Sequence, residues 1–235
     1  MTTERNAMAW EWLAQQYGAS ISTVCRLCEV SRPRGYELAR TWQQAGFVHT
    51  QRMPSEGPGG SWSNELWVWP TRETAWAFLG FDPGPWFPRL TTVAHTRALA
   101  ELRLTLTGRE LDPEVWTSER LLRRESNPWR SQCSRHVHDG WFTDGSGDRW
   151  AVEVELSVKS RAGRAVRSLR AALEAAHSEN LTGVVYFVRG RAVRRSVDNA
   201  ARILSEQGQD ELLAMLDIRD LDRFLTGTTN SEEAS

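Results

Sequence analysis

The sequence has very little lysine and cysteine, and it has no long apolar run. Lys159 is the only lysine among 29 basic residues, so arginine carries nearly all the positive charge. Three cysteines are an odd and small number, which predicts reduced thiols instead of a disulfide framework. No apolar run approaches the roughly 20 residues of a membrane span, and the N-terminus lacks the basic-then-apolar order of a signal peptide. These absences predict a cytoplasmic protein that does not interact with membranes.

The composition is that of an ordinary globular protein, with 40% hydrophobic and 25% charged residues in a chain of 235. That length has room for two small domains. The net charge of −1 conceals an uneven distribution along the chain. Residues 159–195 hold nine basic residues against two acidic ones, whereas residues 205–235 hold eight acidic against two basic. Because arginine and lysine make most contacts to phosphate, the basic segment suggests a polyanionic partner.

The N-terminal part has the pattern of a helix-turn-helix. Residues 7–17 and 23–29 have apolar side chains at helical spacing, and Ser20 or Ser22 can cap the second helix. A third helix is predicted from Arg32, with Pro33 in its first turn and Gly46 just after its end.

The segment after the third helix predicts a wing. Residues 47–52 and 65–69 alternate like strands on either side of a Gly/Pro-rich loop at 54–60. Two strands behind a recognition helix favour a winged helix that reads DNA. The alternative is a small helical domain that binds a protein. The side chains expected to reach phosphates and base edges are Arg32, Arg34, Arg40, Thr41 and Gln44.

Prolines divide the chain further on. Three of them lie within residues 80–88, which cannot sustain a helix or a central strand. A connecting or dimerising helix is predicted at 92–107. The expected organisation is a winged helix-turn-helix domain at 1–80, a linker and connecting helix at 81–110, a second domain at 111–225 and a disordered tail at 226–235.

Carboxylates gather in the stretch from Asp139 to Lys159. Strand side chains alternate, so Glu153 and Glu155 share one face of the strand predicted at 150–156. A hairpin turn before this strand would bring Asp139 back toward them. Three clustered carboxylates repel one another unless protons or a cation neutralise them, and hard divalent ions prefer such oxygen ligands.

The second domain is expected to be an α/β sandwich with a mixed sheet, in an α+β chain overall. The apolar run TGVVYFV is typical of a strand that is buried on both faces. The predicted order is a helix at 117–125, the carboxylate hairpin, a basic amphipathic helix at about 161–179, the strand at 182–188 and a helix at 194–207.

This order, with an Asp followed by Glu-x-Glu, resembles the core of the PD-(D/E)XK superfamily, the restriction-endonuclease-like fold. The chain as a whole is similar to the replication-relaxation family of actinobacterial plasmids and mobile elements. The similarity lies in the winged helix, the segments LWVWPTRETAW and AVEVELSVKS, the helix that carries His95, and residues 116–120. It implies a double-stranded DNA-binding protein that acts in replication, relaxation or transfer of such an element.

The resemblance also implies a site. Asp139 matches the Asp of the nuclease motif and Glu153 its acidic residue, and together they would hold Mg²⁺ for phosphodiester hydrolysis. Glu155 stands where the motif has Lys, and His138 where it has Pro. Lys159 would then be a displaced lysine, and Glu119 resembles an additional helix glutamate of Holliday-junction resolvases. The flanking phosphates would be held by Arg161, Arg164, Arg167 and Arg170.

Three alternatives stay open at this stage. The nuclease-like site is either an active Mg²⁺-dependent endonuclease or nickase, or an acidic surface that no longer cuts. Two segments have zinc-like spacings, Cys25-x-x-Cys28 and Cys133-x-x-His136-x-His138. Both thiols of the first segment, however, fall on one predicted helix. An antitoxin-like regulator would instead dock an element-encoded protein partner through the acidic tail at 205–235. A palindromic DNA target would require a homodimer.

Overall fold

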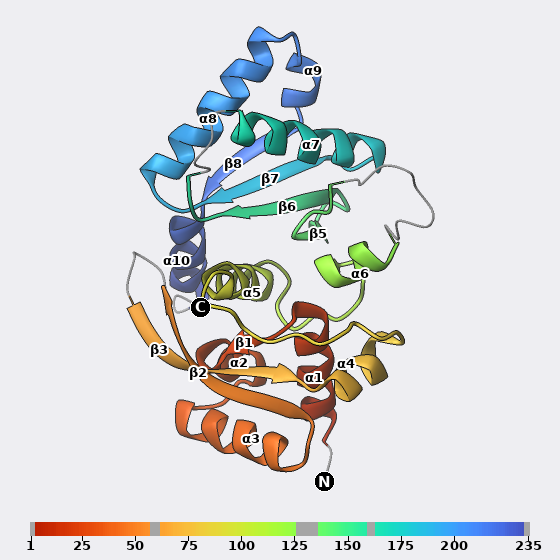
Figure 1. Cartoon of the computed structure of the whole chain (residues 1–235), viewed down its shortest axis with the longest axis vertical. Coiled ribbons are helices and arrows are strands. Elements are labelled where there is room, and N and C mark those ends of the chain that lie inside the picture. Colours follow the sequence, from red (N-terminus) through yellow and green to blue (C-terminus); the bar gives the residue numbers. More distant parts are fainter. Residues whose placement is uncertain (1–2, 57–61, 126–135, 159–162, 233–235) are drawn as a thin grey trace. The chain divides into compact units, whose positions relative to one another are not determined.

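The structure, a computed structural model, describes residues 3–56, 62–125, 136–158 and 163–232. The chain forms two compact units, unit 1 at Met1–Asp112 and unit 2 at Pro113–Ser235. Each unit has its own sheet and its own apolar core (Figure 1). Within the described ranges, no helix combines the length and the apolar character needed to cross a membrane.

Unit 1 combines helices with a three-stranded antiparallel sheet in the order β1-β3-β2. The hairpin of β2 and β3 supplies most of this sheet, and the short strand β1 pairs with the other edge of β3. The elements are α1 (Glu4–Gln16), β1 (Ala19–Ser20), α2 (Ile21–Cys28), α3 (Arg32–Gln44), β2 (Val48–Glu56), β3 (Trp62–Pro70), α4 (Arg72–Leu79) and α5 (Val93–Thr107).

Tryptophan side chains dominate the core of unit 1. Trp12 and Trp42 are almost fully buried, and the ring of Trp10 stacks on Phe47 with 4.0 Å between centroids. Ser20 caps α2, because its side chain accepts a hydrogen bond from the amide of Thr23. The helices and the hairpin expected from the sequence are therefore present, with ends shifted by a few residues.

Residues 81–110 belong to unit 1, although their prolines suggested a linker between domains. The indole of Trp86 lies edge-on to Trp69 at 6.4 Å between ring centroids, and it also contacts Tyr17. Helix α5 packs its Ala100 and Leu104 into the core that α1 and α2 share. Burial of these apolar side chains, which proline content does not reveal, holds the segment on unit 1.

Unit 2 is built on a five-stranded mixed sheet in the order β4-β5-β6-β7-β8. Strands β4, β5 and β6 are antiparallel neighbours, whereas β6, β7 and β8 run parallel. The elements are β4 (Trp116–Ser118), α6 (Glu119–Glu125), β5 (Gly140–Thr143), β6 (Arg149–Glu155), α7 (Arg164–Ser178), β7 (Gly183–Val188), α8 (Arg191–Glu206), α9 (Asp210–Leu213), β8 (Leu216–Asp220) and α10 (Leu221–Glu232).

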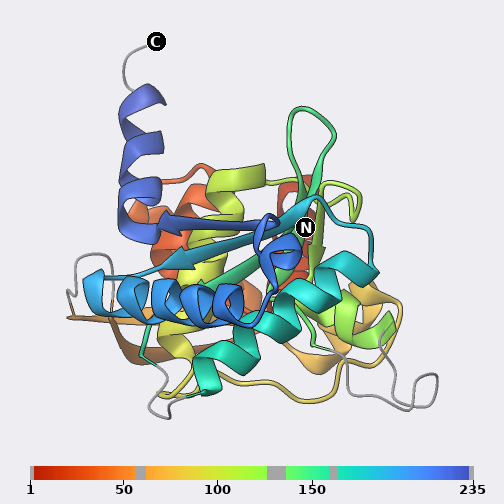
Figure 2. The same ribbon diagram turned by 90° about the horizontal axis from the view of Figure 1, so that it is seen from above.

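Helices α7 and α8 lie side by side on one face of this sheet (Figures 1 and 2). Their apolar side chains, among them Leu169, Leu173 and Val197, form a core with Val184 of β7. On the opposite face, Phe224 of α10 contacts Phe187 with 5.1 Å between ring centroids. The mixed sheet expected from the sequence is confirmed, and every residue of β7 is buried as its apolar run predicted.

Two parts of unit 2 differ from the sequence predictions. Residues 116–118 form strand β4 instead of entering a helix, because Trp116 packs over Gly140 where a Cβ would lie 2.6 Å from its ring. Pairing with β5 therefore overrides the helix-capping pattern. The other difference is α10, which extends to Glu232 through a segment whose composition suggested disorder from 226 onward. Leu221, which is completely buried, anchors the start of that helix.

Candidate functional site

Helix α3 is held against α2 by an unusually close contact. A Cβ on Gly35 would lie 2.3 Å from the Sγ of Cys25, so the absence of a side chain at Gly35 lets the two helices approach. Leu38, Ala39 and Trp42 bury the same side of α3. Among the described residues, those on the opposite side of α3 are exposed.

The outer side of α3 carries the polar residues that the sequence pattern singled out. Arg34 forms an ion pair with Glu37 at 2.8 Å, and both side chains are more than half exposed. The hydroxyl of Thr41 donates to the carbonyl of Glu37 at 2.9 Å, which leaves its oxygen able to accept. The residues of this outer face are all exposed: Arg34, Glu37, Arg40, Thr41 and Gln44.

An open depression of about 300 Å³ lies between α3 and the hairpin. Thr50 of β2 donates to the side-chain oxygen of Gln43 at 2.8 Å across it, and the guanidinium of Arg52 lies 5.9 Å from the Tyr36 ring centre. The depression is lined by the following residues, which include one acid and one arginine: Tyr36, Glu37, Arg40, Gln43, Thr50 and Leu66.

A buried ionic network ties the start of α3 to the rest of unit 1. Glu65 of β3 is buried, and it accepts hydrogen bonds from Ser22 at 2.8 Å to both oxygens. Arg97 of α5 lies 3.5 Å from Glu65 and donates to Glu101 at 2.8 Å. Arg32 is also 3.4 Å from Glu65, although its side chain is 60% exposed. Arg32 is therefore partly engaged inside unit 1, in contrast to the exposed outer face of α3.

In unit 2, Asp139 binds the main chain of the neighbouring strand. Its amide donates to the carbonyl of Val152 at 3.1 Å, and its Oδ2 accepts from the amide of Val154 at 2.8 Å. These two bonds extend the β5–β6 ladder and place Asp139 beside Glu153. One carboxylate oxygen of Asp139 thus has a structural role.

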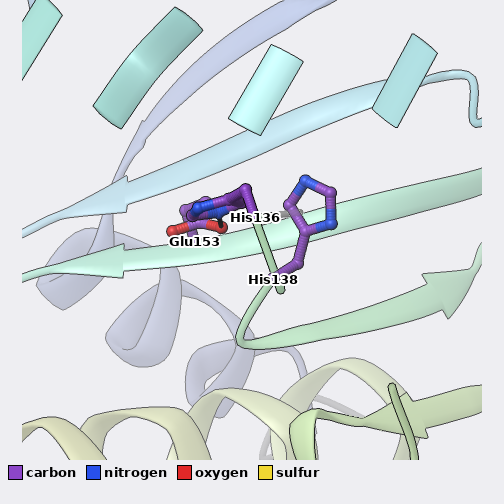
Figure 3. A group of neighbouring side chains, drawn as sticks. All are labelled: His136, His138 and Glu153. Carbon is purple, nitrogen blue, oxygen red and sulfur yellow. Dashed lines mark hydrogen bonds and ion pairs between the residues drawn. The ribbon is translucent and has the colours of Figure 1, made fainter. Parts of the chain in front are cut away.

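Glu153 faces a histidine. Its Oε1 lies 2.6 Å from Nε2 of His136, and the two side chains are 13% and 21% exposed. Figure 3 shows the two groups directed at one another, with the ring of His138 beside them. Nitrogen and carboxylate ligand atoms of His136, His138 and Glu153 all lie within 4.8 Å of one another.

Both ring nitrogens of His138 already have partners. Nε2 lies 3.0 Å from the carbonyl of Ala172, which can only accept, so this nitrogen carries the proton. Nδ1 accepts from the indole of Trp141 at 3.1 Å. Burial lowers the pKa of His138 to about 4, so the ring is neutral at pH 7. His138 therefore positions its neighbours, and a metal ion would have to displace one of its hydrogen bonds.

Tyr186 of β7 lies opposite Glu153 in the sheet. It is the register partner of Glu153 on the parallel strand β7, and it is buried. Burial raises the pKa of its hydroxyl well above the usual value, and the charges of Glu153, Glu155 and Asp139 raise it further. Glu155 and Tyr186 also line a small cavity between the sheet, α7 and α8. The charges of the carboxylates that the sequence grouped therefore all act on one protonated phenol.

The other predicted site residues lie in different surroundings. Glu119 of α6 accepts a hydrogen bond from Arg123 of the same helix at 2.8 Å. Arg164 and Arg167 are exposed near the start of α7, whereas Arg170 is partly buried and bonded to Gln207. Lys159 and Arg161, two of the predicted site residues, lie outside the described residues.

Mg²⁺, which the nuclease resemblance implies, fits these residues poorly. Mg²⁺ prefers an octahedron of oxygen ligands. Of the two expected ligands, Asp139 binds a main-chain amide and Glu153 faces an imidazole. Within the described ranges, one group of three histidine, cysteine or acidic side chains is close enough together to hold a metal ion. It consists of His136, His138 and Glu153, so it contains neither Asp139 nor Glu155.

Sequence reasoning gave no specific role to two residues of this site. His136 appeared only as part of a zinc-like spacing, and its contact with Glu153 depends on the path of the chain before β5. Tyr186 was hidden in an apolar run, and only the register of β7 against β6 places it opposite Glu153. That register is a long-range pairing, so no local pattern could have revealed it.

The thiols of Cys25 and Cys28 are poor metal ligands as they stand. Burial raises the pKa of Cys28 to about 11, and it also raises the pKa of Cys25. Because metals bind the thiolate, protonated thiols at neutral pH weigh against the first zinc-like spacing. Cys133, from the second spacing, lies outside the described residues.

Comparisons of the chain with protein-family models, with curated proteins and with solved structures found no match. The assignment of a function therefore depends on the geometry of the two units themselves.

Proposed function

We propose that unit 1 is a winged helix that binds double-stranded DNA, with α3 as the helix that enters the major groove. The observation that carries this proposal is the outer face of α3, where exposed arginine, threonine and glutamine side chains stand on a helix whose other side is buried. A helix of this width fits the major groove, and these residue types bind base edges and phosphates.

The surroundings of α3 support the same proposal. Helices α2 and α3 precede an antiparallel hairpin, which is the order in which a winged helix presents its recognition helix and its wing. The depression beside α3 is lined by Arg40, Gln43 and Thr50, which suit a phosphate of the DNA backbone. The proposed role is replication, relaxation or transfer of a plasmid or mobile element, in line with the family resemblance.

A fluorescence anisotropy titration of the full chain with labelled duplex DNA tests this proposal. Binding should be detectable at low ionic strength, and it should weaken steeply as salt is added, because released counterions dominate such affinities. Arg34→Ala should weaken binding further without unfolding the protein, since its side chain is exposed. An absence of binding at low salt would refute the proposal.

A second candidate function, phosphodiester hydrolysis by a restriction-endonuclease-like unit 2, is favoured by one observation. The pKa of Tyr186 is raised by the charges of three carboxylates, Asp139, Glu153 and Glu155. Two of them, Glu153 and Glu155, lie toward the carboxyl end of β6, which runs parallel to β7. Ligands of open α/β sheets bind beside the carboxyl ends of the strands.

Supercoiled plasmid incubated with the full chain, in separate reactions with Mg²⁺ and Mn²⁺, tests the second candidate. Nicked or linear product that disappears with Asp139→Asn would support cleavage. Plasmid that stays supercoiled with both ions would leave DNA binding as the function.

A further inference from the structure

The contact between His136 and Glu153 places a nitrogen ligand where the sequence predicts a site made of oxygens. We propose that these two residues bind a divalent ion of borderline hardness, such as Zn²⁺ or Co²⁺, in preference to Mg²⁺. The proposal concerns unit 2 alone and does not depend on DNA binding by unit 1.

The two ligand atoms already face one another, and the pair must open to admit an ion. Nε2 of His136 and Oε1 of Glu153 are 2.6 Å apart. Zinc binds imidazole nitrogen and carboxylate oxygen at about 2.0–2.2 Å in a tetrahedron, so two ligands of one ion sit about 3.4 Å apart. The two ligand atoms would therefore move apart by about 0.8 Å for an ion to take the place of the shared hydrogen. The remaining coordination positions would be open to water or to a phosphate oxygen.

The neighbouring groups fix the two ligands. The ring of His138 stands nearly perpendicular to that of His136, with 5.0 Å between centroids, and its own nitrogens are held by Ala172 and Trp141. Glu153 lies on a central strand of the sheet, paired on one side with β7. Pre-positioned ligands lose little conformational freedom when a metal binds, which favours affinity.

The chemistry of the ligands sets the preference among ions. Imidazole suits borderline ions such as Zn²⁺ and Co²⁺, whereas Mg²⁺ keeps to oxygen ligands and retains much of its water. The carboxylates of Asp139 and Glu155 add negative charge near the site, which attracts any cation. Charge therefore favours cation binding in general, and the nitrogen of His136 provides the selectivity.

Calorimetric titration of the full chain with Zn²⁺, Co²⁺ and Mg²⁺ under reducing conditions tests the proposal. One equivalent of Zn²⁺ or Co²⁺ should bind, with much weaker binding of Mg²⁺. Removal of a residue that only hydrogen-bonds a metal ligand already costs about 10- to 100-fold in metal affinity, so His136→Gln and Glu153→Gln should each cost at least about tenfold. The absorption spectrum of bound Co²⁺ should be lost in the same two variants.

Matched variants make the outcome decisive. His177→Gln removes an exposed histidine of α7 and should leave affinity unchanged. A variant with Cys25→Ser and Cys28→Ala should also bind normally. The proposal is overturned if the chain takes up no Zn²⁺ or Co²⁺, if Mg²⁺ binds as tightly, or if folded His136→Gln keeps the native affinity. Because His136 is partly exposed and lies outside the strands, its variant should fold even if Glu153→Gln does not.

Discussion

The two units treat their charged side chains differently. In unit 1, some charges are buried together, as in the network of Glu65 and Arg97, and others are exposed, as on α3. In unit 2, the charged residues that the sequence singled out are largely half-buried and engaged by other groups of the same unit, as Glu153 is by His136.

This difference separates residues that are ready to bind a partner from residues that must first release one. The guanidinium of Arg40 on α3 can meet a phosphate without losing an internal bond of the sheet or core. The carboxylate of Glu153 cannot accept a metal ion until its contact with His136 opens. We therefore expect substitutions in the buried network to lower stability, substitutions on α3 to weaken DNA binding, and substitutions at Glu153 to weaken metal binding.

The largest effect is expected from Glu65→Ala. This change removes the anion that faces Arg97, whose side chain is only 11% exposed, and leaves a buried charge without its full compensation. Loss of one partner from a buried pair costs about 3–5 kcal/mol. Urea unfolding followed by tryptophan fluorescence should show a destabilised unit 1.

Glu37→Ala is the matched control, because it breaks the exposed pair with Arg34. Exposed pairs contribute about 0–1 kcal/mol. Equal losses of unfolding free energy in Glu65→Ala and Glu37→Ala would show that burial does not distinguish the network of Glu65 from the exposed face of α3.

The second effect concerns DNA affinity. Arg34→Ala combined with Arg40→Ala should weaken duplex binding by at least about 30-fold, because contacts to bases are worth about 1–3 kcal/mol each. The thermal midpoint should hardly change, since both side chains are exposed. Fluorescence anisotropy at fixed salt measures this loss.

Arg164→Ala combined with Arg167→Ala removes the same charge from α7, where both side chains are exposed as well. This pair should weaken binding less than the α3 pair does. A larger loss from the α7 pair would move the DNA interface to unit 2.

The smallest effect is expected from Gly35→Ala. The new Cβ would lie 2.3 Å from Sγ of Cys25, so α3 must move outward or the thiol must rotate. Overpacking costs about 1–3 kcal/mol, and the higher helix propensity of alanine returns about 1 kcal/mol. Unfolding measurements should therefore show a net loss of about 1 kcal/mol.

Cys25→Ala in the same chain removes the obstructing sulfur and should recover stability in a double-mutant cycle. Additive effects of the two substitutions would mean that this contact does not set the position of α3.

Local patterns predicted the elements of both units, and long-range pairing decided the rest. Alternation within β6 placed Glu153 and Glu155 on one face, and both lie near Tyr186 in the structure. The pattern could not show that Trp116 pairs with Phe142 and packs its ring over Gly140, which turns a predicted helix start into strand β4.

The candidate site depended still more on contacts between distant residues. The approach of His136 to Glu153 joins positions that are 17 residues apart, and it follows from the path of the chain before β5. Proline content likewise suggested a linker at 81–110, whereas the burial of Trp86 and α5 places this segment in unit 1.

Hydrogen exchange of the full chain, measured with and without saturating duplex DNA, tests the central claim most directly. DNA should protect the amides of α3 and of the β2–β3 hairpin, and it should leave α7 and β6 unchanged. Protection confined to α7 and β6, or no protection in unit 1 at saturation, would contradict the assignment of DNA binding to α3.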